Sequence, residues 1–88
     1  KGLGIFPYTL PGSQELADRT IALLDDYDVV MWTKHGALAI GTDLIEAFDQ
    51  IDVLSKSAKI YESARSMGFV PTGMSDAEMQ ELKEVFGL

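Results

Sequence analysis

His35 is the residue of this chain whose type and position best fit catalytic chemistry, and it is the only histidine in the sequence. It follows an apolar run, Val29 to Trp32, and directly precedes Gly36. A neutral imidazole at the end of a strand can serve as a metal ligand, because the strand holds it rigidly while it stays open to a site. A histidine that makes only hydrogen bonds at a strand terminus fits the same position. Because a catalytic zinc needs three protein ligands, the residues alone leave both roles open.

Other candidate groups give weaker signals. Asp25, Asp26 and Asp28 could form an oxygen-rich cation site, but their spacing fits no calcium loop, and a solvated helix end explains them as well. The serines lie in predicted helices or caps and lack a Gly-x-Ser-x-Gly context. The glycines follow neither the dinucleotide-binding nor the phosphate-loop spacing. We expect Trp32 to pack in the core.

The elements that would position His35 lie in the first half of the chain. They are expected, in chain order, as an extended edge segment at residues 3–10, a helix at 14–27, a strand at 29–32 and a second strand at 37–40. Ser13 is a candidate N-cap for the helix. Gly36 is the residue at which we expect the chain to turn between the two strands, or to continue past a bulge.

Two further helices are predicted in the second half. The first opens at Thr42–Asp43 and ends near Met67, with Gly68 just beyond its end. Its apolar face consists of Leu44, Phe48, Ile51, Leu54, Ala58 and Tyr61. A capping box, Ser75 with Glu78, begins the last helix at 76–86. The fold class is therefore α/β (α+β), a short strand pair flanked by helices. Two strands form no independent sheet, so we expect the sheet to be incomplete.

Composition narrows the function classes. The chain has 88 residues, enough for at most one domain, and a net charge of -7. An acidic surface disfavours nucleic acid and anionic membranes as partners. No apolar run approaches the roughly 20 residues that span a bilayer. The absence of cysteine excludes disulfides and zinc–thiolate sites, and it suits a cytoplasmic protein.

Several segments of the sequence together form a recognisable pattern. They are Gly4-Ile5-Phe6-Pro7-Tyr8, Leu10-Pro11-Gly12-Ser13-Gln14-Glu15-Leu16, Trp32-Thr33-Lys34-His35-Gly36, Phe48, Ile51-Asp52, Lys56-Ser57-Ala58 and Ser66-Met67-Gly68. These segments resemble the rhamnulose-1-phosphate aldolase family within the class II aldolase/adducin superfamily. The resemblance covers nearly the whole chain, and it is closer to the rhamnulose branch than to the fuculose branch.

The resemblance implies a fold and an activity. The family fold is an α/β/α sandwich that assembles as a homotetramer with active sites near the subunit interfaces. Three histidines hold a zinc ion, and His35 matches the third of them, which precedes a glycine. The reaction cleaves a sugar-phosphate substrate, L-rhamnulose 1-phosphate, to dihydroxyacetone phosphate and L-lactaldehyde. Zinc acts as the Lewis acid, and a glutamate handles the proton transfer.

The resemblance also implies what this chain lacks. The other two zinc ligands and the catalytic glutamate belong to the upstream part of the family pattern. We therefore expect residues 1–88 to be the C-terminal fragment of a single aldolase domain, inactive on its own. Two alternatives stay open. One is an epimerase or dehydratase of the same superfamily acting on a sugar phosphate, and the other is a non-catalytic, adducin-like binding module.

Overall fold

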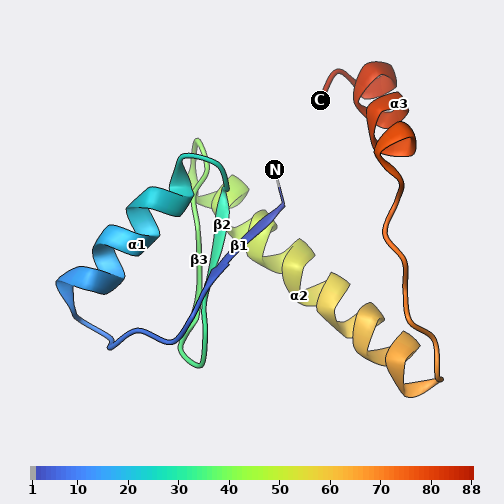
Figure 1. Cartoon of the computed structure of the whole chain (residues 1–88). Coiled ribbons are helices and arrows are strands. Elements are labelled where there is room, and N and C mark those ends of the chain that lie inside the picture. Colours follow the sequence, from blue (N-terminus) through green and yellow to red (C-terminus); the bar gives the residue numbers. More distant parts are fainter. Residues whose placement is uncertain (1) are drawn as a thin grey trace. The chain divides into compact units, whose positions relative to one another are not determined.

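The computed structural model of the chain describes residues 2–88, with three helices and three strands (Figure 1). The elements are β1 (Leu3–Phe6), α1 (Gln14–Leu24), β2 (Val29–Trp32), β3 (Gly36–Ala39), α2 (Leu44–Ser66) and α3 (Asp76–Phe86). The chain divides into two compact units, and the boundary in the sequence falls within α2, between Ala58 and Lys59. The first unit contains the sheet and the second contains α3.

The three strands form one sheet with the order β1-β2-β3. β1 runs parallel to β2, with Leu3 opposite Val29, and β2 runs antiparallel to β3, with Trp32 opposite Gly36. The sequence predicted a strand pair, so the third strand is a correction. Pro7 follows β1 and does not interrupt it, which leaves the four preceding residues free to pair. The prediction of an extended segment at the edge is confirmed.

The core lies between the sheet and α1. Phe6, Leu16 and Val30 are buried together, and the partly buried Trp32 packs against them. Side chains alternate along a strand, so Val30 and Trp32 point to the same face of β2. That face is the one α1 covers. Trp32 therefore lies in the core, as expected, while remaining partly accessible.

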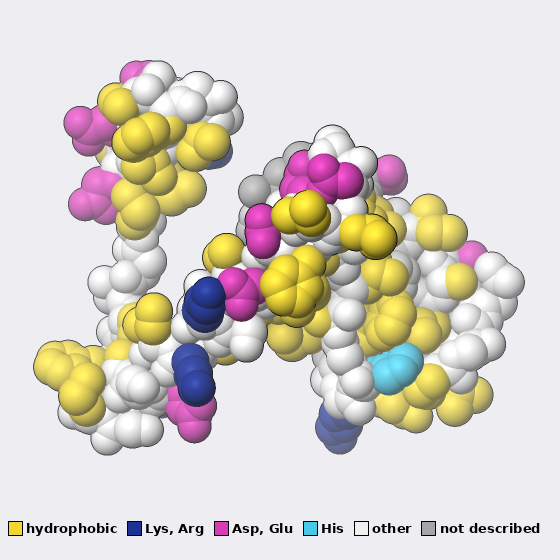
Figure 2. Space-filling model, turned by 180° about the vertical axis from the view of Figure 1, so that it is seen from behind, with side chains coloured by type: hydrophobic (Ala, Val, Ile, Leu, Met, Phe, Trp, Pro, Cys, Tyr) yellow, Lys and Arg dark blue, Asp and Glu magenta, His cyan; other side chains and the backbone are white. Residues whose placement is uncertain are grey.

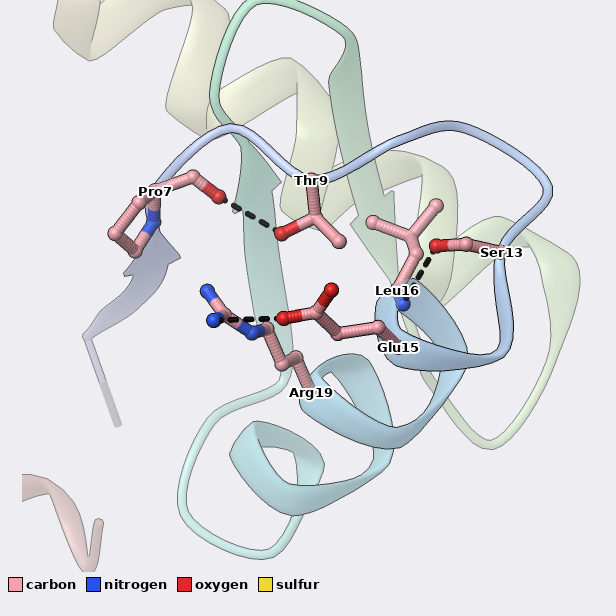
Figure 3. Close-up of polar contacts among 6 residues, drawn as sticks. All are labelled: Pro7, Thr9, Ser13, Glu15, Leu16 and Arg19. Atoms are coloured by element: carbon pink, nitrogen blue, oxygen red, sulfur yellow. Dashed lines mark hydrogen bonds and ion pairs between the residues drawn. The ribbon is translucent and has the colours of Figure 1, made fainter.

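The start of α1 is fixed by a side-chain cap, as the sequence predicted. The Ser13 hydroxyl accepts a hydrogen bond from the Leu16 backbone N–H at 3.1 Å (Figure 3). In the loop before it, the buried Thr9 hydroxyl donates to the Pro7 carbonyl at 3.1 Å. An ion pair between Arg19 and Glu15, 2.9 Å long, lies on the exposed surface of α1 and contributes little to stability.

The end of α1 differs from the prediction. The apolar spacing placed it at about Tyr27, whereas the helix ends at Leu24 and Asp25 is its C-cap. The N–H groups of Asp26 and Tyr27 still donate to the Leu23 carbonyl, at 3.1 and 2.9 Å. The chain therefore makes one more turn after the helix. Acidic residues at a helix C-terminus oppose the helix dipole, which accounts for the earlier stop.

α2 has the expected bounds and a side-chain cap. The Glu46 N–H donates to the Asp43 carboxylate at 2.8 Å, and the Thr42 hydroxyl hydrogen-bonds to the Glu46 carboxylate at 2.5 Å. Asp52 pairs with Lys56 at 2.7 Å, and this hydrogen bond raises the pKa of the lysine. The helix ends at Ser66, and Gly68 follows with a left-handed backbone, φ 87°.

The predicted apolar face of α2 is largely uncovered in this chain. Only Ile51 and Leu54 of that face are partly buried, whereas Leu44 and Phe48 are exposed. The spacing identified the helix correctly, but no described element packs along its whole length. Leu54 lines a hollow together with Leu3 and Val29. Those strand residues point away from α1, so the first half of α2 faces the other side of the sheet.

The second unit contains α3, which begins with the predicted capping box. The Ser75 hydroxyl accepts from the Glu78 N–H at 3.2 Å, and the Ser75 N–H donates to the Glu78 carboxylate at 2.7 Å. This backbone hydrogen bond lowers the pKa of the Glu78 carboxyl. The helix runs over Asp76–Phe86, as predicted, and Gly87 closes it at φ 67°.

The architecture is mixed α/β with an incomplete sheet, which confirms the predicted fold class. Helices flank the short strands of the first unit, as expected for part of a class II aldolase sandwich. Within residues 2–88, none of the helices combines the length and the apolar character needed to cross a bilayer.

Candidate metal centre

His35 lies in the tight turn between β2 and β3. Its backbone N–H donates to the Trp32 carbonyl at 2.9 Å, which closes the turn. The expected role of Gly36 in this turn is wrong. Lys34 is the residue with the left-handed backbone, at φ 63°, whereas Gly36 is the first residue of β3. Apart from its chain neighbours, no atom of residues 2–88 lies within 4 Å of the position where a Cβ of Gly36 would be. A lysine takes the conformation that glycine usually supplies.

The imidazole of His35 stacks on the indole of Trp32. The two ring centroids lie 4.9 Å apart, and the ring planes differ by 26°. This distance is within the range that favours aromatic pairs. The sequence interpretation gave Trp32 only a core role and missed this contact. The signal that could have found it is that the two residues are three positions apart in the sequence, a separation at which a tight turn brings side chains together.

A hydrogen-bond chain connects Trp32 to α1. The indole Nε1–H donates to the Thr20 hydroxyl at 3.0 Å, and that hydroxyl donates to the Leu16 carbonyl at 2.7 Å. Thr20 is buried, so its hydroxyl has a fixed set of partners. A buried hydroxyl without a hydrogen-bond partner lowers the stability of the fold. The arrangement in which Thr20 bonds to both Trp32 and Leu16 is therefore favoured. The indole is therefore held at its nitrogen as well as by packing.

The turn has a second anchor on the neighbouring strand. The Thr33 hydroxyl donates to the Phe6 carbonyl at 2.6 Å, although 27 positions separate the two residues. Phe6 is the last residue of β1 and is buried in the core. The residues on the N-terminal side of His35 are thus tied to α1 through Trp32 and to β1 through Thr33.

The His35 side chain is exposed, at the surface of the first unit among hydrophobic side chains (Figure 2, cyan). Stacking occupies a face of the ring, whereas the two nitrogens lie on its edge and can bind a metal. Within residues 2–88, no hydrogen bond joins either ring nitrogen to another residue. The chemistry of the side chain therefore fits one ligand of a zinc ion.

The described residues do not complete a metal site. Among residues 2–88, no three histidine, aspartate or glutamate side chains gather closely enough to hold a metal ion. Asp25 and Asp26 are exposed after the end of α1, and Asp28 is partly buried just before β2. The structure does not bring these three carboxylates together with His35 as one ligand set. A metal site that included His35 would therefore need further ligands from outside the described residues.

Comparison with known proteins gives the family. The model of a family described as Class II Aldolase and Adducin N-terminal domain matches residues 1–62 of this chain. The match covers all three strands, α1 and most of α2. The chain therefore belongs to the class II aldolase and adducin family.

Individual relatives carry a more specific name. Rhamnulose-1-phosphate aldolase from Bacteroides thetaiotaomicron is 59% identical over 88 residues, which are 100% of this chain and 33% of that protein. The proteins of the same name from Pectobacterium atrosepticum and Enterococcus faecalis are 36% and 33% identical over 87 residues, 99% of this chain and 32% and 31% of theirs. The chain spans about a third of the length of the curated relatives it matches. Its expected place in the C-terminal part of such a protein stays a prediction.

Proposed function

We propose that this chain is part of a class II aldolase that cleaves L-rhamnulose 1-phosphate to dihydroxyacetone phosphate and L-lactaldehyde. The observation that carries the proposal is the 59% identity, over the whole chain, to a protein named rhamnulose-1-phosphate aldolase. The matches at 33% and 36% identity bear the same name. An epimerase, a dehydratase or a binding module of the same superfamily has less support, because none of these relatives carries such a name.

His35 is the residue through which this chain would contribute to catalysis. It is exposed at the end of β2, and its ring nitrogens are free of hydrogen bonds to the described residues. These features support a role as one of three histidine ligands to zinc. When bound, zinc would supply a Lewis acid that withdraws electrons from the ketose carbonyl. This chain would hold one imidazole in place for that purpose.

The rest of the site would lie in a longer protein. The chain covers 33% of its 59%-identical relative. The described residues contain no complete ligand set, so His35 would be the one ligand of three that this chain supplies. The other two histidines and the catalytic glutamate would precede this segment, which would then be the C-terminal part of the domain. Large apolar side chains on α2, such as Leu44 and Phe48, are exposed here and would be covered by the remainder or by neighbouring subunits of a homotetramer. The enzyme would act in the cytoplasm.

The experiment that tests this function is a retro-aldol assay on the intact protein that carries this chain. Purified protein is incubated with L-rhamnulose 1-phosphate, and the release of dihydroxyacetone phosphate is followed by a coupled reduction. We expect release by the unchanged protein and by the control Asp49→Asn, which alters an exposed residue of α2. His35→Ala should abolish release while the far-ultraviolet circular dichroism stays unchanged.

Two outcomes would contradict the proposal. Bound zinc without release of dihydroxyacetone phosphate would favour an epimerase or dehydratase over an aldolase. A protein with neither zinc nor activity would leave His35 as a histidine of a binding module. The isolated chain should show no activity in the same assay, because one imidazole does not complete a zinc site.

A further inference from the structure

Trp32 and Thr20 together hold the side chain of His35, and neither has a role in the proposed reaction so far. The indole of Trp32 lies against a face of the imidazole, with ring centroids 4.9 Å apart. The same indole donates its N–H to the Thr20 hydroxyl at 3.0 Å. The sequence contains one tryptophan and one histidine, so this contact joins two unique residues.

Burial decreases from Thr20 through Trp32 to His35. Thr20 is 6% exposed and is itself bonded to the Leu16 carbonyl at 2.7 Å, one turn earlier in α1. Trp32 is partly buried against the core, and His35 is exposed. The order Thr20–Trp32–His35 therefore leads from a fixed helix backbone to a solvent-facing ring.

Stacking restricts an exposed imidazole in a way that suits a metal ligand. An unsupported histidine on a surface turn samples several rotamers, and fixing it costs conformational entropy when a metal binds. A ring held by one face has already lost part of that freedom, whereas its edge nitrogens stay available. Residues that orient a metal-binding histidine commonly do so through a hydrogen bond to its second nitrogen. Here the contact is made through the ring face.

We propose that Trp32 is a positioning residue for His35, that its indole limits the rotation of the imidazole, and that Thr20 fixes the indole through the bond to Nε1. The inference rests on the proposed role of His35 as a zinc ligand. In this proposal Trp32 and Thr20 act on the metal through the histidine, by the stack and by the hydrogen bond that holds the indole.

The test compares zinc affinity among variants of the intact protein that carries this chain. Thr20→Val removes the acceptor of the indole N–H at nearly constant volume, and Thr20→Ser is its matched control, because serine keeps the hydroxyl. Trp32→Leu removes the stacking face, and Trp32→Phe restores an aromatic face without the N–H. We expect Trp32→Leu to bind zinc about 10- to 100-fold more weakly, the range found for residues that orient metal ligands.

Thr20→Val should also weaken zinc binding. The zinc affinities of Thr20→Ser and Trp32→Phe should be closer to that of the unchanged protein. The visible absorption spectrum of the cobalt-substituted protein gives a second readout, since it responds to ligand geometry. It should change in Thr20→Val and stay unchanged in Thr20→Ser. A purely structural role would lower the thermal midpoint while leaving both the zinc affinity and the cobalt spectrum unaltered, and that result would overturn the inference.

The control variant His35→Ala separates this inference from the proposed function. Loss of zinc in His35→Ala together with unchanged affinity in Trp32→Leu and Thr20→Val would refute the positioning role and leave the ligand assignment standing. Retention of zinc in folded His35→Ala would refute the ligand assignment and the inference with it. Should Trp32→Leu not fold, the Thr20→Val and Thr20→Ser pair decides the outcome.

Discussion

Replacing Gly41 by alanine should destabilise the protein, whereas the same change at Gly36 should not. Both glycines lie close to His35 in the sequence, and neither has the left-handed backbone that disfavours alanine. They differ in their surroundings. A Cβ at Gly41 would lie 2.8 Å from the Ala47 backbone nitrogen and 3.0 Å from the Glu46 Cβ. A Cβ at Gly36 would meet no described atom within 4 Å beyond those of its chain neighbours.

The magnitude follows from these distances. Ordinary van der Waals contact begins at 3.4 Å, so an alanine at Gly41 is 0.6 Å too close to a backbone atom (3.4 minus 2.8). The atoms that it meets belong to the first turn of α2, where they cannot move aside as a flexible side chain would. Overpacking of this kind costs about 1–3 kcal/mol. Restricting the unfolded chain gains about 0.4–1 kcal/mol in both variants, so it cancels in their difference.

Urea unfolding of the two variants, followed by far-ultraviolet circular dichroism, measures this difference. Gly36→Ala should be as stable as the unchanged protein or slightly more so. Gly41→Ala should be less stable than Gly36→Ala by about 1–3 kcal/mol. Equal stability of the two variants, or a less stable Gly36→Ala, would show that the room for a Cβ at these two glycines does not determine the effect.

Three further changes test local features of the chain. Ser13→Ala removes the acceptor of the Leu16 N–H and should destabilise α1 by about 1 kcal/mol in urea unfolding, with Ser13→Asn as the control that keeps a cap. Lys34→Val places a β-branched residue at φ 63° and should lower stability by about 1–2 kcal/mol, whereas Lys34→Gly should be tolerated. The Ser75 N–H lowers the pKa of the Glu78 carboxyl below 4.5, so the contact stabilises α3 above that pH and the stabilisation is lost as the pH falls through the lower folded pKa. Unfolding measured between about pH 6 and pH 3 should show this loss, and a Glu78→Gln variant with the same acid dependence would contradict it.

Local features of the fold could be read from the sequence because neighbouring residues determine them. Ser13 and Ser75 cap their helices as predicted, since a cap depends on side chains within one turn. The Asp52–Lys56 pair also lies where its four-residue spacing places it. The strand before His35 occupies Val29–Trp32, because an apolar run bounded by polar residues is a local signal.

The remaining features depend on parts of the chain that are distant in sequence. β1 pairs with β2 through residues 26 positions apart, such as Leu3 and Val29, and no local pattern indicates such a partner. The residue of the turn with a left-handed backbone is Lys34. The turn was predicted at Gly36 instead, because glycine is the residue that usually takes this conformation. The stack of Trp32 on His35 follows from the turn geometry and from the bond to Thr20.

The zinc content of the intact protein shows whether His35 is a zinc ligand. Unchanged protein and His35→Ala are purified in parallel, and metal and protein are measured in the same samples. We predict about one zinc per chain in the unchanged protein, held by three protein ligands, and almost none in folded His35→Ala. Stoichiometric zinc in folded His35→Ala would show that His35 is not a zinc ligand.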